Sequence, residues 1–86
     1  MVVNIPTPLR SYTGGAREVE ASGASLAAVL ESLDEQFPGI RFRIVDEQDQ
    51  IRSHIKFFVG YELAASLAEP VGTLDEVHII CALSGG

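Results

Sequence analysis

The sequence predicts an α+β fold, a roll in which one main helix packs across a mixed sheet of four or five strands. Three observations predict it: a hairpin pattern at the N-terminus, one helical stripe after it, and short strands of alternating polarity in the remainder. A helix with one apolar stripe and a sheet with one apolar face can cover each other. A chain of 86 residues supports one such core.

The N-terminal hairpin is expected from two strands and a glycine turn. Val2–Pro6 reads as a strand that ends at proline, which has no N–H for a sheet ladder. Arg17–Ala21 alternates polar and apolar residues with the period of a half-buried strand. Between them, Gly14 and Gly15 indicate a turn, because glycine adopts positive φ without steric cost. These segments together predict a hairpin.

The helix is expected from about Ser25 to Phe37. Its apolar residues recur with the spacing of one helical face. Ser25 can cap its N-terminus, although the residue three positions on is Ala28 and completes no capping box. Pro38 ends it, because proline lacks the N–H that a further turn uses. The apolar stripe consists of Leu26, Val29, Leu30, Leu33 and Phe37.

The second half of the chain predicts further strands. After a short apolar stretch at 40–45 and a solvated turn at 46–50, Ile51–Val59 reads as a strand. The stretch 61–75 is expected to be irregular, with Glu62–Leu67 as either a short strand or a helical turn. Glu76–Leu83 reads as the last strand. Alternation assigns one apolar face to Ile55, Phe57, Val59, Val77, Ile79, Cys81 and Leu83.

The same alternation sends Phe58 and Ile80 to the opposite face. If the two strands are neighbours, both side chains lie in one apolar patch on the open face of the sheet, and grouped apolar surface is typical of an interface. In the alternative reading, the loop at 61–75 covers them and they belong to the core. Phe58 and Ile80 are therefore predicted as a partner-binding patch.

Composition excludes several classes of function. Twelve acidic and six basic residues give a net charge of −6, which disfavours nucleic acid and anionic membranes and suits a basic protein partner. No apolar run reaches the length of a membrane helix, and the N-terminus has no secretory pattern, so a cytoplasmic location is expected. The single cysteine, Cys81, can form neither an internal disulfide nor a multi-thiolate metal site.

The residues that indicate a chemical function are Gly85 and Gly86, which come soon after the last predicted strand. We expect a folded domain at 1–83 and a flexible Ser-Gly-Gly tail at 84–86. Such a tail is slim enough to enter a narrow tunnel, and an activated glycyl carbonyl has no β-carbon to hinder a nucleophile. A frayed glycine end or a cloning remnant is the alternative explanation.

The chain resembles the ThiS/MoaD sulfur-carrier family of ubiquitin-like β-grasp proteins, and most closely its cysteine-biosynthesis branch. The resemblance spans nearly the whole chain, and its most specific parts are Ile5-Pro6-Thr7, Leu9-Arg10, Thr13-Gly14-Gly15, Asp75-Glu76-Val77 and Gly85-Gly86. It implies that an E1-like enzyme adenylates Gly86 with Mg-ATP. The adenylated glycine would then be converted to a thiocarboxylate that donates sulfide to cysteine, cofactor or secondary-metabolite synthesis. Gly85 would give the tail access to the enzyme.

The resemblance also implies partners: the adenylating enzyme, and sulfur-donating and sulfur-accepting enzymes, with a cysteine-synthase-like enzyme as one option. It implies no bound cofactor. Three other readings stay open: a ubiquitin-like modifier joined through Gly86 to lysines, the small subunit of a molybdopterin-synthase-like complex, and an interaction module whose diglycine is incidental.

The remaining polar residues favour structural explanations. Cys81 alternates with apolar neighbours, which favours a buried small residue over a sulfur relay. His54 and His78 have no partners at metal-ligand spacing and read as surface or strand positions, and the acidic run at 46–49 lacks the features of a calcium loop. We therefore expect no catalytic residues and no metal site, and a chain that is not itself an enzyme.

Overall fold

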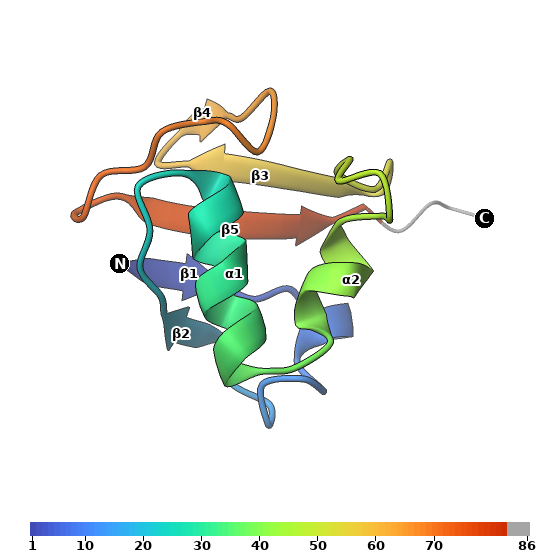
Figure 1. The fold of residues 1–86 in the computed structure, drawn as a ribbon. Coiled ribbons are helices and arrows are strands. Elements are labelled where there is room, and N and C mark those ends of the chain that lie inside the picture. Colours follow the sequence, from blue (N-terminus) through green and yellow to red (C-terminus); the bar gives the residue numbers. More distant parts are fainter. Residues whose placement is uncertain (83–86) are drawn as a thin grey trace.

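The computed structural model describes residues 1–82, and Leu83, Ser84, Gly85 and Gly86 lie outside the described residues. Within that range the chain forms one mixed sheet with its main helix on one face, so the predicted α+β roll is confirmed (Figure 1). The sheet order is β2-β1-β5-β3-β4. The strands are β1 (Val2–Asn4), β2 (Glu18–Glu20), β3 (Ile55–Val59), β4 (Glu62–Leu63) and β5 (Glu76–Cys81), and the helices are α1 (Leu26–Gln36) and α2 (Ile40–Ile44), with a short 3₁₀ helix η1 (Thr7–Leu9).

The predicted hairpin is confirmed, with a longer connection than a tight turn. β1 and β2 pair antiparallel, with Val3 opposite Val19. The chain between them forms η1 and then the glycine turn, where Gly14 and Gly15 both have positive φ. The buried hydroxyl of Thr13 donates toward the carbonyls on either side of this turn. These contacts of the Thr13 hydroxyl hold the loop closed.

Helix α1 has the predicted bounds and the predicted buried face. The Ser25 hydroxyl accepts a hydrogen bond from the Ala28 N–H at 3.3 Å, and Phe37 caps the C-terminus. The first four stripe residues are fully buried and Phe37 is half-buried. They face Val3, Phe57, Val77 and Ile79, which form the covered face of the sheet. The core thus lies between α1 and one face of the sheet.

The stretch at 40–45 is a helix, α2, which the sequence analysis left unassigned. Gly39 starts it with φ of 96°, a left-handed conformation that suits glycine. The Asp34 carboxylate then accepts hydrogen bonds from the N–H groups of Gly39 and Arg41, both at 3.1 Å. Ile40 and Ile44, four residues apart, are both buried. One helical turn therefore buries the apolar residues that the sequence shows there.

The strand expected at Ile51–Val59 begins only at Ile55. The N–H of Ile55 donates to the Arg52 carbonyl in a turn at 2.9 Å, so the strand cannot extend back through this position. Ile51 instead makes an isolated bridge with Val45. Of the two structures expected for Glu62–Leu67, the short strand is correct, and it is β4.

The last strand, β5, occupies Glu76–Cys81 and lies in the middle of the sheet. It pairs parallel with β1 and antiparallel with β3. The predicted position of Leu83 on the covered face lies outside the described residues. Between Met1 and Ala82, no helix has both the length and the apolar character needed to span a bilayer.

Candidate functional site

The C-terminal segment leaves the sheet from its most firmly held strand. β5 has hydrogen-bonded neighbours on both sides, and Val77 and Ile79 are buried beneath α1. One residue beyond the strand, the N–H of Ala82 still donates to the His54 carbonyl at 2.7 Å. The sheet therefore fixes the chain up to the residue before the undescribed segment. Gly85 and Gly86, the predicted reactive residues, lie outside the described residues.

The sheet face opposite α1 carries the predicted patch residues. The β3–β5 register places Phe58 opposite His78 and Ile80 opposite Lys56. Phe58 and Ile80 are therefore diagonal neighbours, a relation in which Cβ atoms lie about 7–8 Å apart. Ile80 is 45% exposed, whereas Phe58 is half-buried rather than exposed. The structure thus brings the two residues onto one face.

Leu63 joins them, and the sequence analysis missed it. It lies on β4 directly opposite Phe58, and its side chain is 58% exposed. The signal was present: a two-residue turn at Gly60 and Tyr61 pairs Val59 with Glu62, and hence Phe58 with Leu63. We call Phe58, Leu63 and Ile80 the open-face patch.

A polar cluster lies beside the open-face patch. The Asn4 side-chain amide donates to the Glu76 carboxylate at 2.6 Å and lies 3.1 Å from Nδ1 of His78. As an acceptor at Nδ1, His78 carries its proton on Nε2, which lies 3.8 Å from the same carboxylate. The cluster ties β1 to β5, so His78 occupies a strand position as expected.

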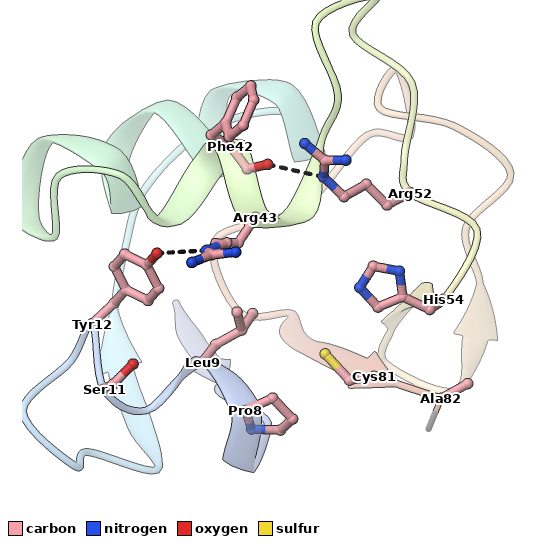
Figure 2. Close-up of a pocket in the computed structure, with 10 residues that line it drawn as sticks. All are labelled: Pro8, Leu9, Ser11, Tyr12, Phe42, Arg43, Arg52, His54, Cys81 and Ala82. Atoms are coloured by element: carbon pink, nitrogen blue, oxygen red, sulfur yellow. Dashed lines mark hydrogen bonds between the residues drawn. The ribbon is translucent and has the colours of Figure 1, made fainter. Parts of the chain in front are cut away.

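Two pockets of the described chain meet at Cys81, where β5 ends. The larger has a volume of about 790 Å³, and Figure 2 shows its lining. The smaller, of about 520 Å³, opens beside β1 and β5 and shares Pro8 and Cys81 with the first. The larger is lined by Pro8, Leu9, Ser11, Tyr12, Phe42, Arg43, Arg52, His54, Cys81 and Ala82.

Cys81 is half-buried rather than buried, and its thiol lies at the pocket wall. Burial raises the pKa of this thiol above its usual value. A raised pKa keeps the group protonated at neutral pH, and the protonated thiol is a poor nucleophile. The position is consistent with packing and gives no sign of an activated sulfur.

The acidic run at 46–49 is a structural turn, as expected. The Asp46 carboxylate accepts from the N–H groups of Gln48 and Gln50 at 2.9 and 3.0 Å. Asp49 pairs instead with Arg41, at 3.1 Å. Among residues 1–82, no group of three or more His, Cys, Asp or Glu side chains could hold a metal ion.

Comparisons with known proteins agree on one family. The ThiS family matches residues 3–86. The sulfur carrier protein CysO of Mycobacterium tuberculosis is 35% identical over 91 residues, which cover 100% of this chain and 98% of the relative. The CysO of Mycobacterium bovis gives the same values.

Solved structures give the same fold. CysO in the Amycolatopsis orientalis BexX/CysO complex has a TM-score of 0.91 and 33% identity, and the match covers 99% of this chain and 98% of that chain. CysO of Mycobacterium tuberculosis has a TM-score of 0.89 at 33% identity, over 95% and 98%. SAMP1 from Haloferax volcanii has a TM-score of 0.78 at 25% identity, over 99% and 97%. The protein is therefore a member of the ThiS family with a ubiquitin-like β-grasp fold.

Proposed function

We propose that this protein is a sulfur carrier, whose Gly86 carboxylate is the group that partner enzymes activate and load with sulfur. The observation that carries the proposal is the position of Gly85 and Gly86 in the sequence, four and five residues after the central strand β5, in a chain related over its full length to proteins named sulfur carriers. We propose that the reaction takes place in the cytoplasm, where ATP for adenylation is supplied.

The chemistry follows from the carboxylate itself. A carboxylate oxygen of Gly86 attacks the α-phosphate of Mg-ATP, held by an E1-like enzyme, and releases pyrophosphate. A sulfide equivalent then attacks the acyl-adenylate carbon, and AMP leaves with the bonding electrons. The product is a thiocarboxylate that can donate sulfide to an accepting enzyme. Glycine suits this step, because it has no Cβ to obstruct the carbonyl.

The protein acts in this scheme as a co-substrate, not as the catalyst. What supports this is that relatives matching the whole chain are named sulfur carrier proteins. The chemistry then belongs to the enzymes that bind the chain, and no cofactor needs to reside on it.

The open-face patch is the surface that we assign to the activating enzyme. Ile80 and Leu63 are exposed, and with Phe58 they form an apolar group on the same strand that leads to Gly86. Contiguous apolar surface on a small domain is typical of an interface. The CysO relative solved in a BexX/CysO complex supports a partner enzyme for this chain also.

The test is an intact-mass measurement. The full chain is incubated with an E1-like adenylating enzyme, Mg-ATP and a sulfide source, and replacement of one oxygen by sulfur should map to Gly86. A variant with one alanine added after Gly86 is the matched control and should stay unmodified. If the wild-type mass is unchanged while the enzyme exchanges pyrophosphate with another carrier, the proposal is wrong.

A second candidate is a protein modifier, favoured by the likeness to the small archaeal modifier protein SAMP1. In that reaction a lysine amine replaces sulfide as the nucleophile. Incubation with a lysine-rich acceptor protein separates the two: a sulfur carrier gives the thiocarboxylate, whereas a modifier gives an isopeptide at Gly86.

A further inference from the structure

Three of the five arginines line the two pockets that meet at Cys81, where β5 ends. Arg43 and Arg52 line the larger pocket, and Arg10 lines the smaller one. Both pockets include Cys81, the last residue of the strand. Neither lining contains an aspartate or a glutamate, although the chain has twelve acidic residues and a net charge of −6. We call Arg10, Arg43 and Arg52 the arginine collar.

Each collar arginine is anchored through the same atom. Nε of Arg43 donates to the Tyr12 hydroxyl at 2.6 Å, and Nε of Arg52 donates to the Phe42 carbonyl at 2.9 Å, as Figure 2 shows. Both guanidinium groups also lie over an aromatic ring, Arg43 at 5.9 Å from the Tyr12 centroid and Arg52 at 4.9 Å from the Phe42 centroid. The two pairs hold their cations at defined positions on the pocket rim.

Arg10 is held in the same way, since its Nε donates to the Ile5 carbonyl at 3.0 Å. Within residues 1–82, no hydrogen bond or ion pair engages the two Nη groups of any collar arginine. Arg41 differs, because its Nη2 already binds Asp49. The hydrogen bond that Arg43 donates to the Tyr12 hydroxyl also raises the pKa of Arg43, a side chain that is already charged at neutral pH. The collar therefore presents guanidinium groups at fixed positions, and within residues 1–82 their Nη groups make no hydrogen bond.

The N–H groups of a guanidinium held in this way match the geometry of a carboxylate. A guanidinium can bind a carboxylate with two parallel hydrogen bonds, and a side chain already fixed by stacking loses less entropy when it does so. Neither pocket lining contributes a carboxylate; Glu62, Asp75 and Glu76 lie at the end of the sheet where β5 begins, and Asp49, in the turn after α2, is paired with Arg41. Net charge alone indicates a basic partner, but the cationic linings of the two pockets at the end of β5 indicate an acidic one.

We infer that the arginine collar docks on an acidic rim around the tunnel mouth through which the activating enzyme receives the Gly86 segment. The inference rests on the proposed function. Opposite charges at the tunnel mouth would steer the chain end-first, because acidic residues at the far end of the sheet are repelled while the collar is attracted. The apolar open-face patch then supplies contact area beside the collar.

The test compares two double variants of the full chain with equal changes in net charge. Arg43→Glu with Arg52→Glu removes two of the three collar guanidinium groups. Arg17→Glu with Arg41→Glu is the matched control; Arg41 and Arg43, two positions apart on α2, point to different sides of the helix. Association with the adenylating enzyme is followed by stopped-flow fluorescence at low and high salt, after thermal unfolding has shown both variants folded.

We expect the collar variant to associate about tenfold or more slowly at low salt, with the difference shrinking as salt screens the charges. The control variant should stay close to wild type. Equal slowing of both variants would show a net-charge effect and overturn the inference, as would an unaffected collar variant. A shift of the Gly86 amide resonance in the collar variant without enzyme would mean that the collar guanidinium groups hold the chain's own carboxylate, which also overturns it.

Two further arms separate this inference from the proposed function. At saturating enzyme the collar variant should still gain sulfur at Gly86, with a raised KM and an unchanged kcat. If wild type gains none, the proposed function fails, and the collar is judged by titrating the chain with a hexaglutamate peptide. That peptide should shift the Arg43 and Arg52 Nε–H resonances; no shift, or an equal shift with inorganic phosphate, would refute a docking site for protein carboxylates.

Discussion

At the scale of single residues, the proposed reactive group and the proposed contact surfaces are chemically different. Gly86 offers a carboxylate without a hindering side chain, whereas the open-face patch and the arginine collar offer apolar and cationic contacts. In the proposed function these surfaces bind the partner enzyme, whereas the Gly86 carboxylate is the group that reacts. Substitutions at the two kinds of position should therefore affect different kinetic constants.

The alanine added after Gly86 should abolish activation and leave the thermal unfolding midpoint unchanged. One residue displaces the carboxylate by about 3.5 Å along the chain, which is enough to remove it from an enzyme's reacting atoms. Differential scanning calorimetry and the mass assay measure the two properties on one sample. Activation of the extended chain at the wild-type rate would contradict a role for the terminal carboxylate.

Ile80→Asp should weaken binding of the adenylating enzyme strongly at little cost to stability, because 45% of this side chain is already exposed. Phe58→Asp should weaken binding as well, but with a loss of about 1–3 kcal/mol of stability, because the charge enters a half-buried site. Titration calorimetry and thermal unfolding give the two values. Collapse of the fold in the Ile80 variant would assign the patch to the core.

Cys81 should react slowly with iodoacetamide. Burial raises the pKa of its thiol, so at any given pH less thiolate is present than on an exposed cysteine, and the half-maximal rate moves to higher pH. A pH series of alkylation rates, with a short unstructured cysteine peptide as the control, measures the shift. A midpoint below that of the peptide would indicate an activated thiol and reopen a sulfur relay.

At the scale of elements, α2 is the piece that places one collar arginine. Its start depends on Gly39 in the left-handed conformation and on the Asp34 carboxylate, which accepts from two N–H groups across the junction with α1. Arg43 follows on this helix and reaches the Tyr12 hydroxyl. The position of Arg43 thus depends on the junction between α1 and α2.

Asp34→Ala should lower the free energy of unfolding by about 1 kcal/mol, the usual value of a helix-capping carboxylate. Glu35→Ala, at the next and exposed position, is the control and should be near neutral. Urea unfolding measures both. Equal stability of the two variants would show that the Asp34 hydrogen bonds do not hold the junction.

At the scale of the whole molecule, the proposed role of the fold is to present the Gly86 segment to partner enzymes. The first strand, β1, and the last strand, β5, lie side by side in parallel in the interior of the sheet (Figure 1). Helix α1 covers one face and leaves the other open. The same sheet thereby supplies one face for the core and, in the proposed function, one face for contact with a partner enzyme.

Leu30→Ala tests the separation of fold and chemistry at this scale. Leu30 is fully buried, and its truncation should cost about 2–5 kcal/mol of stability. Below the unfolding midpoint, sulfur loading of Gly86 at saturating enzyme should keep the wild-type rate, because the reacting groups belong to the tail and the enzyme. A large fall in that rate in fully folded protein would contradict this proposed role of the fold.

Local patterns in the sequence determined much of this protein. The stripe from Leu26 to Leu33 predicted α1 with its cap at Ser25, and alternation in β3 and β5 predicted which residues face α1. These predictions succeed because helical and strand periods repeat within a few residues. Gly85-Gly86, to which the proposed chemistry is assigned, could likewise be identified from the sequence alone.

Tertiary structure decided the rest. The helix α2 spans five residues, too few for a period to be recognised, and its start depends on Asp34 from the preceding helix. The arginine collar joins Arg10, Arg43 and Arg52, which are far apart in the sequence and meet only because their segments pack around the end of β5. The collar is positively charged, whereas the whole chain has a net charge of −6. Net charge is a sum over all residues, whereas a pocket depends on which residues the folded backbone brings together.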